Sequence, residues 1–158
     1  NVWAKAVALA MLAAADHDKR GWGLIRFSTR VEGECTVSAG QPRNPQKVMD
    51  ALSQFSGGGT AWTCALDRAR KIIDGEGLKE ADIVLVTDGL CDQADKWLAD
   101  FDRWRTEKGV TLYVVLIGCR SSPTVEALCG SGDKVVAIDD LSGRDGDGSF
   151  QHKVLGKI

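Results

Sequence analysis

Apolar runs separated by helix-type segments constrain the fold of this chain more than any other feature. Three such runs occupy residues 83–87 (IVLVT), 111–118 (TLYVVLIG) and 134–138 (KVVAI). Continuous apolar runs without polar alternation are typical of strands covered on both faces in a parallel sheet. Helices are predicted between them, over residues 95–108 and 124–129. Strands that alternate with helices indicate a doubly wound α/β sheet.

The first half of the chain extends this pattern and adds an antiparallel pair. A tight loop around Gly33 joins strands predicted at residues 22–28 and 35–38, and so short a connection fits antiparallel neighbours. Further helices are predicted from residue 2 to 15, from Asn44-Pro45 to the Gly57–Gly59 turn, and from residue 60 to 73. The expected fold is α/β and Rossmann-like: a doubly wound, mostly parallel sheet with one antiparallel edge strand and helices on both faces.

Composition limits the classes of partner. The chain has 158 residues, 27% of them charged, with a net charge of -2, which fits one soluble domain. No basic stripe predicts nucleic-acid binding, and the longest apolar stretch, residues 6–15, is too short to span a bilayer. The five cysteines are odd in number and none lies in CxxC spacing, so we expect reduced thiols and a cytoplasmic location.

Two segments provide oxygen ligands where a strand or a glycine-rich turn ends. Gly59 and Thr60 close the first, and Asp88 and Gly89 follow the apolar run 83–87 in the second. Doubly wound sheets bind ligands beyond the carboxyl ends of their strands, and hydroxyl and carboxylate groups suit magnesium, manganese or calcium. As simpler alternatives, Thr60 is a helix N-cap and Asp88 caps a loop. The first segment lacks the Gly-Lys-Ser/Thr ending of a phosphate-binding loop.

Three stretches, in this order, resemble von Willebrand factor A (VWA) domains. They are LIRFSTRV (24–31), FSGGGTAWTCAL (55–66) and IVLVTDG (83–89). The resemblance points to the bacterial VWA proteins encoded beside MoxR-type AAA+ ATPases, the ViaA/CoxE-like group. It makes residues 1–141 a VWA-type domain and residues 142–158 a C-terminal loop and tail.

The resemblance implies a metal-ion-dependent adhesion site with Thr60 and Asp88 among its ligands, holding Mg²⁺ (or Mn²⁺ or Ca²⁺) whose open position an acidic partner residue fills. Gly59, Trp62 and Gly89 would then contact the partner. For Trp62 the alternative is packing beneath the loop. The implied function is a metal-assisted protein–protein interaction module, not an enzyme, which works with a MoxR-type ATPase in a chaperone or cofactor-maturation role.

This sequence departs from the family pattern at two places. Ala61 stands where the family often has aspartate, and the DxSxS loop is absent together with the first strand, which is normally central in the sheet. We expect the chain to be a fragment, or to be complemented by a segment from elsewhere. Asp140-x-Ser142 and the acidic stretch 145–149 are weak substitutes for the absent loop, and a solvated loop is their simpler interpretation.

Two rival functions remain open. One is a hydrolytic or nucleotide-binding α/β enzyme that uses the same strand ends, and the other is a degenerate, metal-free VWA scaffold. A nucleophile at Cys64 or Cys91 would need a base. The two histidines, His17 and His152, are not expected near either thiol.

Overall fold

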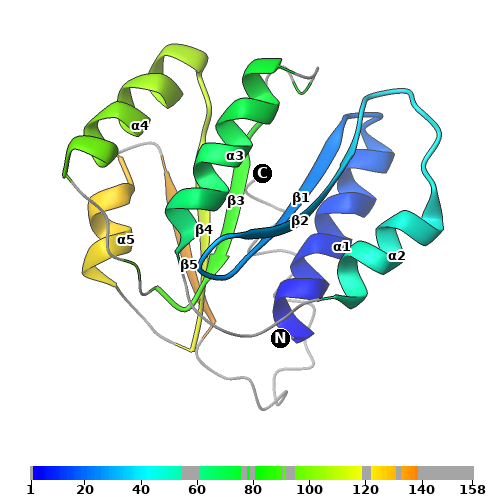
Figure 1. Cartoon of the computed structure of the whole chain (residues 1–158), viewed down its shortest axis with the longest axis horizontal. Helices are drawn as coiled ribbons and strands as arrows, with labels where there is room; N and C mark the ends of the chain where they lie inside the picture. Colours follow the sequence, from blue (N-terminus) through cyan, green and yellow to red (C-terminus); the bar gives the residue numbers. More distant parts are fainter. Residues whose placement is uncertain are drawn as a thin grey trace.

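The structure, a computed structural model, describes residues 2–54, 61–75, 78, 81–89, 91, 95–118, 122–130 and 133–138. Five helices and five strands lie in these ranges (Figure 1). The helices are α1 (Val2–His17), α2 (Pro45–Ser53), α3 (Trp62–Gly75), α4 (Asp95–Lys108) and α5 (Pro123–Leu128). The strands are β1 (Trp22–Phe27), β2 (Val31–Val37), β3 (Ile83–Thr87), β4 (Leu112–Ile117) and β5 (Lys134–Ile138).

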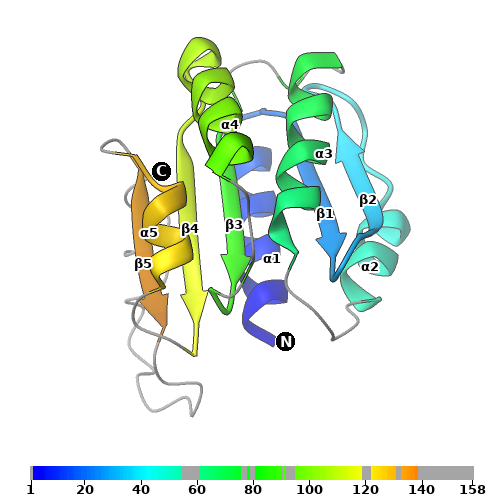
Figure 2. The same ribbon diagram turned by 60° about the vertical axis from the view of Figure 1, so that its left-hand side comes forward.

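The strands form two sheets within the described residues. β1 and β2 are an antiparallel pair, and β3, β4 and β5 are parallel in that order. Figure 2 shows β1 running in the same direction as the three parallel strands, so β2 alone is reversed. The predicted α/β fold is therefore confirmed, with its parallel strands and its antiparallel pair.

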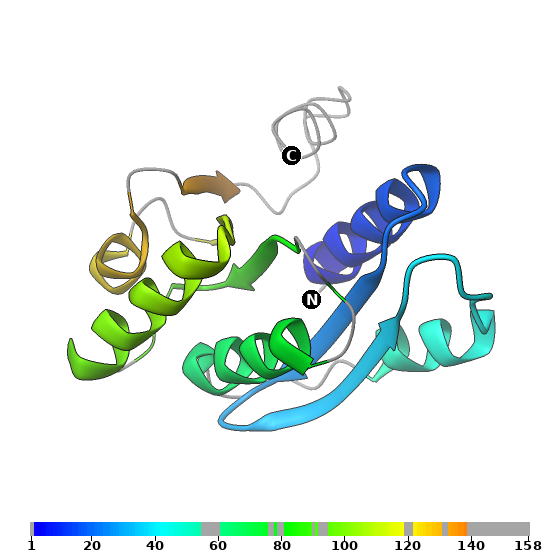
Figure 3. The ribbon, with the colours of Figure 1, turned by 90° about the horizontal axis from the view of Figure 1, so that it is seen from above.

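Helices cover both faces of this strand layer. Seen from above, α3, α4 and α5 lie on one face and α1 and α2 on the other (Figure 3). Each face has its own core cluster. Trp62, Phe101 and Leu112 belong to the larger one, between α3, α4 and the parallel sheet. Ala8, Trp22 and Leu52 belong to the smaller one, between α1, α2 and the antiparallel pair.

The position of the β1–β2 hairpin turn corrects the sequence prediction. Gly33 lies inside β2, opposite Arg26, and the turn falls at Ser28–Arg30 instead. The Arg26 guanidinium occupies the space that a side chain at residue 33 would fill. The contact is with the far end of a flexible side chain from the neighbouring strand, and Gly33 lies within a strand and does not mark a loop.

Most other boundaries agree with the prediction to within two residues, as expected where helix ends fray. The start of α2 is as predicted: Asn44 caps the helix through its side-chain oxygen, which accepts hydrogen bonds from the backbone N–H groups of Gln46 and Lys47. α3 begins at Trp62 and not at residue 60. No helix among the described residues is long and apolar enough to cross a membrane.

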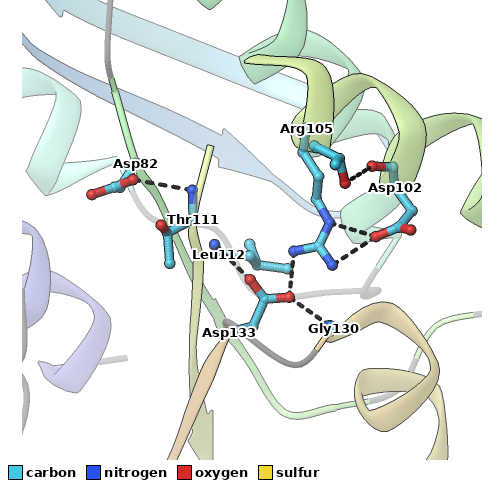
Figure 4. A network of polar contacts seen from close by, with 8 residues as sticks. Asp82, Asp102, Arg105, Thr111, Leu112, Gly130 and Asp133 are labelled. Carbon is cyan, nitrogen blue, oxygen red and sulfur yellow. Dashed lines mark hydrogen bonds and ion pairs between the residues drawn. The ribbon is translucent and has the colours of Figure 1, made fainter. Parts of the chain in front are cut away.

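A buried ion pair fastens α4 to the segment before β5 (Figure 4). The side chains of Arg105 and Asp133 are only 7% and 3% exposed. Asp133 also accepts hydrogen bonds from the backbone N–H groups of Gly130 (2.6 Å) and Leu112 (3.0 Å). One carboxylate thereby joins α4, β4 and the turn before β5, at the amino ends of the parallel strands.

Candidate functional site

The candidate site lies at the carboxyl ends of β1 and β3, which face the same edge of the molecule (Figure 2). Asp88 follows the last residue of β3 and is exposed. Ser28 follows β1, and its carbonyl oxygen accepts a 2.9 Å hydrogen bond from the backbone N–H of Ala61. This bond places Ala61, the residue directly before α3, beside the end of β1.

A pair of hydroxyl groups holds the turn that carries Asp88. Ser122 and Thr124 both donate a hydrogen bond to the carbonyl oxygen of Gly89, at 2.6 Å from Thr124 Oγ1. The two hydroxyls are also 2.8 Å from each other. The N–H of Gly89 donates to Thr87 Oγ1 (3.1 Å), so both backbone polar groups of Gly89 bond internally. We call Thr87, Gly89, Ser122 and Thr124 the hydroxyl clamp.

The clamp changes the interpretation of Gly89 and adds residues that the sequence prediction missed. Gly89 is buried and has a φ of 89°, a conformation that favours glycine, so it shapes the turn and does not offer a partner contact here. Ser122 is also the N-cap of α5, with its side chain accepting from the N–H of Val125. A Ser-Pro-Thr sequence at the start of a helix signals that cap, but nothing in it indicates a bond to a turn 33 residues earlier.

Trp62 does not lie on the partner-facing surface where we predicted it. Its side chain is 0% exposed and packs edge-on against Trp97, with ring centroids 6.0 Å apart. Trp97 in turn stacks on Phe101 in α4. The residue at the start of α3 therefore belongs to the core, and the alternative of packing beneath the loop is the one that its burial favours.

The remaining predicted site residues lie outside the described part of the chain. These are Thr60 and Gly59 and the acidic stretches at 140–142 and 145–149. Within the described residues, no three His, Cys, Asp or Glu side chains gather in a way that could hold a metal ion. Two described carboxylates lie at this edge: Asp88, after β3, and Glu32, which accepts a 2.7 Å hydrogen bond from Ser28 Oγ at the end of β1. A carboxylate suits a hard cation, which needs several oxygen ligands.

The described cysteines and histidine do not assemble into a nucleophile and base. Burial raises the pKa of the Cys64 thiol, and burial raises the pKa of Cys129 to about 11. A raised pKa disfavours the thiolate that nucleophilic chemistry needs. His17 lies at the end of α1 and bonds to Asp18 at 2.8 Å, and His152 is outside the described residues.

The hydroxyl clamp makes a first prediction. Thr124→Val keeps the shape of the side chain but removes one donor to Gly89, and should lower the free energy of unfolding by about 1 kcal/mol. It should also speed hydrogen exchange of the Gly89 N–H, measured by NMR. Thr124→Ser is the matched control, because it keeps the hydroxyl and should retain most of the protection. Equal exchange in both variants would contradict a role for the hydroxyl.

Comparisons with known proteins add a fold assignment to this geometry. No family model matches the chain. An uncharacterized protein of Methanocaldococcus jannaschii is 31% identical over 148 residues, which are 90% of this chain and 32% of that protein. The chain thus spans about a third of the length of this curated relative.

Three solved structures share the arrangement of strands and helices. BatB from Bacteroides thetaiotaomicron has a TM-score of 0.62 at 16% identity, over 97% of this chain and 85% of that chain. The VWA domain of SpRpn10 has a TM-score of 0.59 at 16% identity, over 85% of this chain and 72% of that chain. A von Willebrand factor type A protein from Catenulispora acidiphila has a TM-score of 0.58 at 20% identity, over 86% of this chain and 33% of that chain. Similarity to solved structures at sequence identities this low is evidence for the fold alone. The fold of this chain is that of the von Willebrand factor A domains.

Proposed function

We propose that this chain is a protein-interaction module whose binding face is the edge around Asp88. The observation that carries the proposal is an exposed carboxylate mounted on a turn that two buried or half-buried hydroxyls hold in place. Doubly wound sheets bind ligands beyond the carboxyl ends of their strands, which is where this fixed charge lies. The VWA fold of the chain supports a protein as the ligand.

Magnesium would assist this contact. Asp88 and Thr60 would provide oxygen ligands, and the partner would add an acidic side chain at an open coordination position. Such an ion supplies positive charge between two carboxylates that would otherwise repel each other. The hydrogen-bonded Thr87–Gly89 turn supports the proposal, because a fixed backbone at Asp88 reduces the conformational freedom that is lost when an ion or a partner binds.

The proposed partner is a MoxR-type AAA+ ATPase, with the module acting in a chaperone or cofactor-maturation role in the cytoplasm. This partner follows from the three sequence stretches that resemble ViaA/CoxE-like proteins. A carboxylate-bearing peptide of the ATPase would be the contacting element. With the proposed magnesium ion between them, the partner would supply an acidic residue, so mutating that residue should have the same effect as mutating Asp88.

The test is a calorimetric titration of Mg²⁺, followed by binding of the purified ATPase with and without EDTA. Asp88→Ala should weaken both by roughly 10- to 100-fold. Asp82→Asn is the matched control, because Asp82 is at the opposite end of β3, where it accepts a 3.1 Å hydrogen bond from the Thr111 N–H. It should leave both affinities unchanged.

The outcomes separate the rival functions. ATPase binding that needs Asp88 but not Mg²⁺ would favour the metal-free scaffold over the metal-assisted contact. Turnover of a nucleotide or ester that is lost in Asp88→Ala would favour the hydrolytic α/β enzyme instead. If the ATPase binds equally well to Asp88→Ala and in the presence of EDTA, this edge does not take part in the interaction.

A further inference from the structure

Two cysteines that the proposed function does not use lie at the same edge of the molecule as Asp88. Cys64 lies in the first turn of α3, and Cys91 follows the Thr87–Gly89 turn. Both are half-buried thiols. The start of α3 lies beside the carboxyl end of β3 in both Figure 1 and Figure 2, so the fold brings two thiols from separate segments to one place.

Hydrogen bonds and core packing hold each thiol at this edge. Cys64 Sγ donates a 2.9 Å hydrogen bond to the carbonyl oxygen of Ala61, so the side chain points toward the N-terminal end of α3. Cys91 packs against the larger core cluster, to which Trp62 at the same helix end belongs. The hydroxyl clamp fixes Gly89, two residues before Cys91. Both thiols are therefore attached to backbone that is itself held in place.

Charge on one of these thiols acts on the other. Burial raises the pKa of the Cys64 thiol most, and negative charge on Cys91 raises it further. Coulomb interactions weaken with distance and are screened by solvent, so this effect places the two thiols near each other. The other described cysteines lie elsewhere: Cys35 packs against the smaller core cluster, and Cys129 lies at the C-terminal end of α5.

We propose that Cys64 and Cys91 are a redox-active pair that forms an intramolecular disulfide, which ties the start of α3 to the segment after Asp88. The oxidant is a low-molecular-weight disulfide such as oxidised glutathione. One protein thiolate attacks a sulfur of the oxidant, forms a mixed disulfide and releases one glutathione. The second protein thiolate then attacks the protein sulfur of the mixed disulfide and releases the other glutathione. The two protein thiols give up two protons and two electrons, which the oxidant takes up as two glutathione thiols.

The surroundings of Cys64 make this exchange slow. Only the thiolate attacks a disulfide, and the raised pKa of Cys64 leaves little thiolate at neutral pH. The bond therefore forms under sustained oxidation, and in a reducing compartment it is transient, as redox-sensing disulfides are. The inference is independent of the proposed function, since neither a partner nor a metal ion takes part in the bond or in its detection.

Mass spectrometry tests the proposal. The 158-residue chain is incubated with oxidised glutathione at about pH 8.5, alkylated at its remaining thiols and digested with trypsin. The tryptic peptides 48–68 and 80–96 contain Cys64 and Cys91, and neither contains another cysteine. They should appear as one cross-linked peptide, from a monomer that is two hydrogen atoms lighter. Glutathione that stays on either cysteine without the cross-link, or equal cross-linking of other cysteines, would overturn the proposal.

Serine variants assign the bond to this pair. Cys64→Ser keeps a donor for the Ala61 carbonyl oxygen but should abolish the cross-link, and Cys91→Ser should abolish it as well. Cys35→Ser and Cys129→Ser are the matched controls, and both should retain the cross-link. Loss of the cross-link in a control variant, or a disulfide of Cys91 that persists in Cys64→Ser, would contradict the assignment.

The melting temperature shows whether the bond fits the folded structure. Disulfide geometry is narrow, so a bond between thiols that are out of reach would strain the fold. Oxidation should instead raise the melting temperature by roughly 5–10 °C, because the bond restricts the unfolded chain, and dithiothreitol should reverse the gain. Cys91→Ser treated in the same way should show no gain. A melting temperature that falls when the wild-type bond forms would overturn the proposal.

Discussion

Replacing Asp133 by alanine should lower the free energy of unfolding by about 3–5 kcal/mol, because it leaves a buried guanidinium without its charge partner. The Arg105 side chain is 7% exposed. Burial alone would lower the pKa of Arg105, but its hydrogen bonds to Asp133 and Asp102 outweigh burial and raise it. The side chain keeps its charge in the variant, and the N–H groups of Leu112 and Gly130 lose their acceptor as well.

The matched control removes the second carboxylate that bonds to Arg105. Asp102 also bonds to Arg105, but its side chain is 63% exposed, so Asp102→Ala should cost less than about 1 kcal/mol. Urea unfolding followed by circular dichroism measures both variants. Similar losses in the two would mean that Asp133 contributes no more than an exposed ion pair.

Parts of the fold that depend on local pattern were predictable from sequence. β3 matches its predicted range, and its buried positions agree with the unbroken apolar run expected of a strand covered on both faces. β5 also matches its predicted range, although Val135 is 44% exposed. α4 and the start of α2 also match, the latter because Asn44-Pro45 contains both a cap and a favoured first residue.

Features that depend on distant partners were not predictable. β2 (VEGECTV) alternates half-buried and exposed positions as a strand should, but Gly33 occupies an inward position and suggested a loop. The Arg26 guanidinium lies against it from the neighbouring strand. The hydroxyl clamp likewise joins Thr124 to Gly89, 35 residues apart. A local sequence pattern contains no signal for either contact.

Trp62 shows the same limit for the candidate site and gives the second large prediction. Its place beside the glycine-rich turn in the sequence suggested a partner contact. However, the face of α3 that is buried is set by packing against α4, which the sequence near Trp62 does not show. Trp62→Ala should lower the free energy of unfolding by about 3–5 kcal/mol, because it empties a fully buried site next to Trp97. Thermal or urea unfolding measures this loss.

Trp62→Phe is the control that separates packing from polarity. Within the described residues, Trp62 Nε1 is buried without a hydrogen-bond partner, whereas Trp97 Nε1 donates to Asp67 at 3.0 Å. Phenylalanine keeps an aromatic ring and removes the unpaired N–H, so its cost should be well below that of alanine. If Trp62 contacted a partner instead, Trp62→Ala would leave the unfolding midpoint unchanged and weaken partner binding alone. A large loss of stability in Trp62→Ala with a small loss in Trp62→Phe would place the residue in the core and leave Asp88 as the described side chain on which the proposed interaction depends.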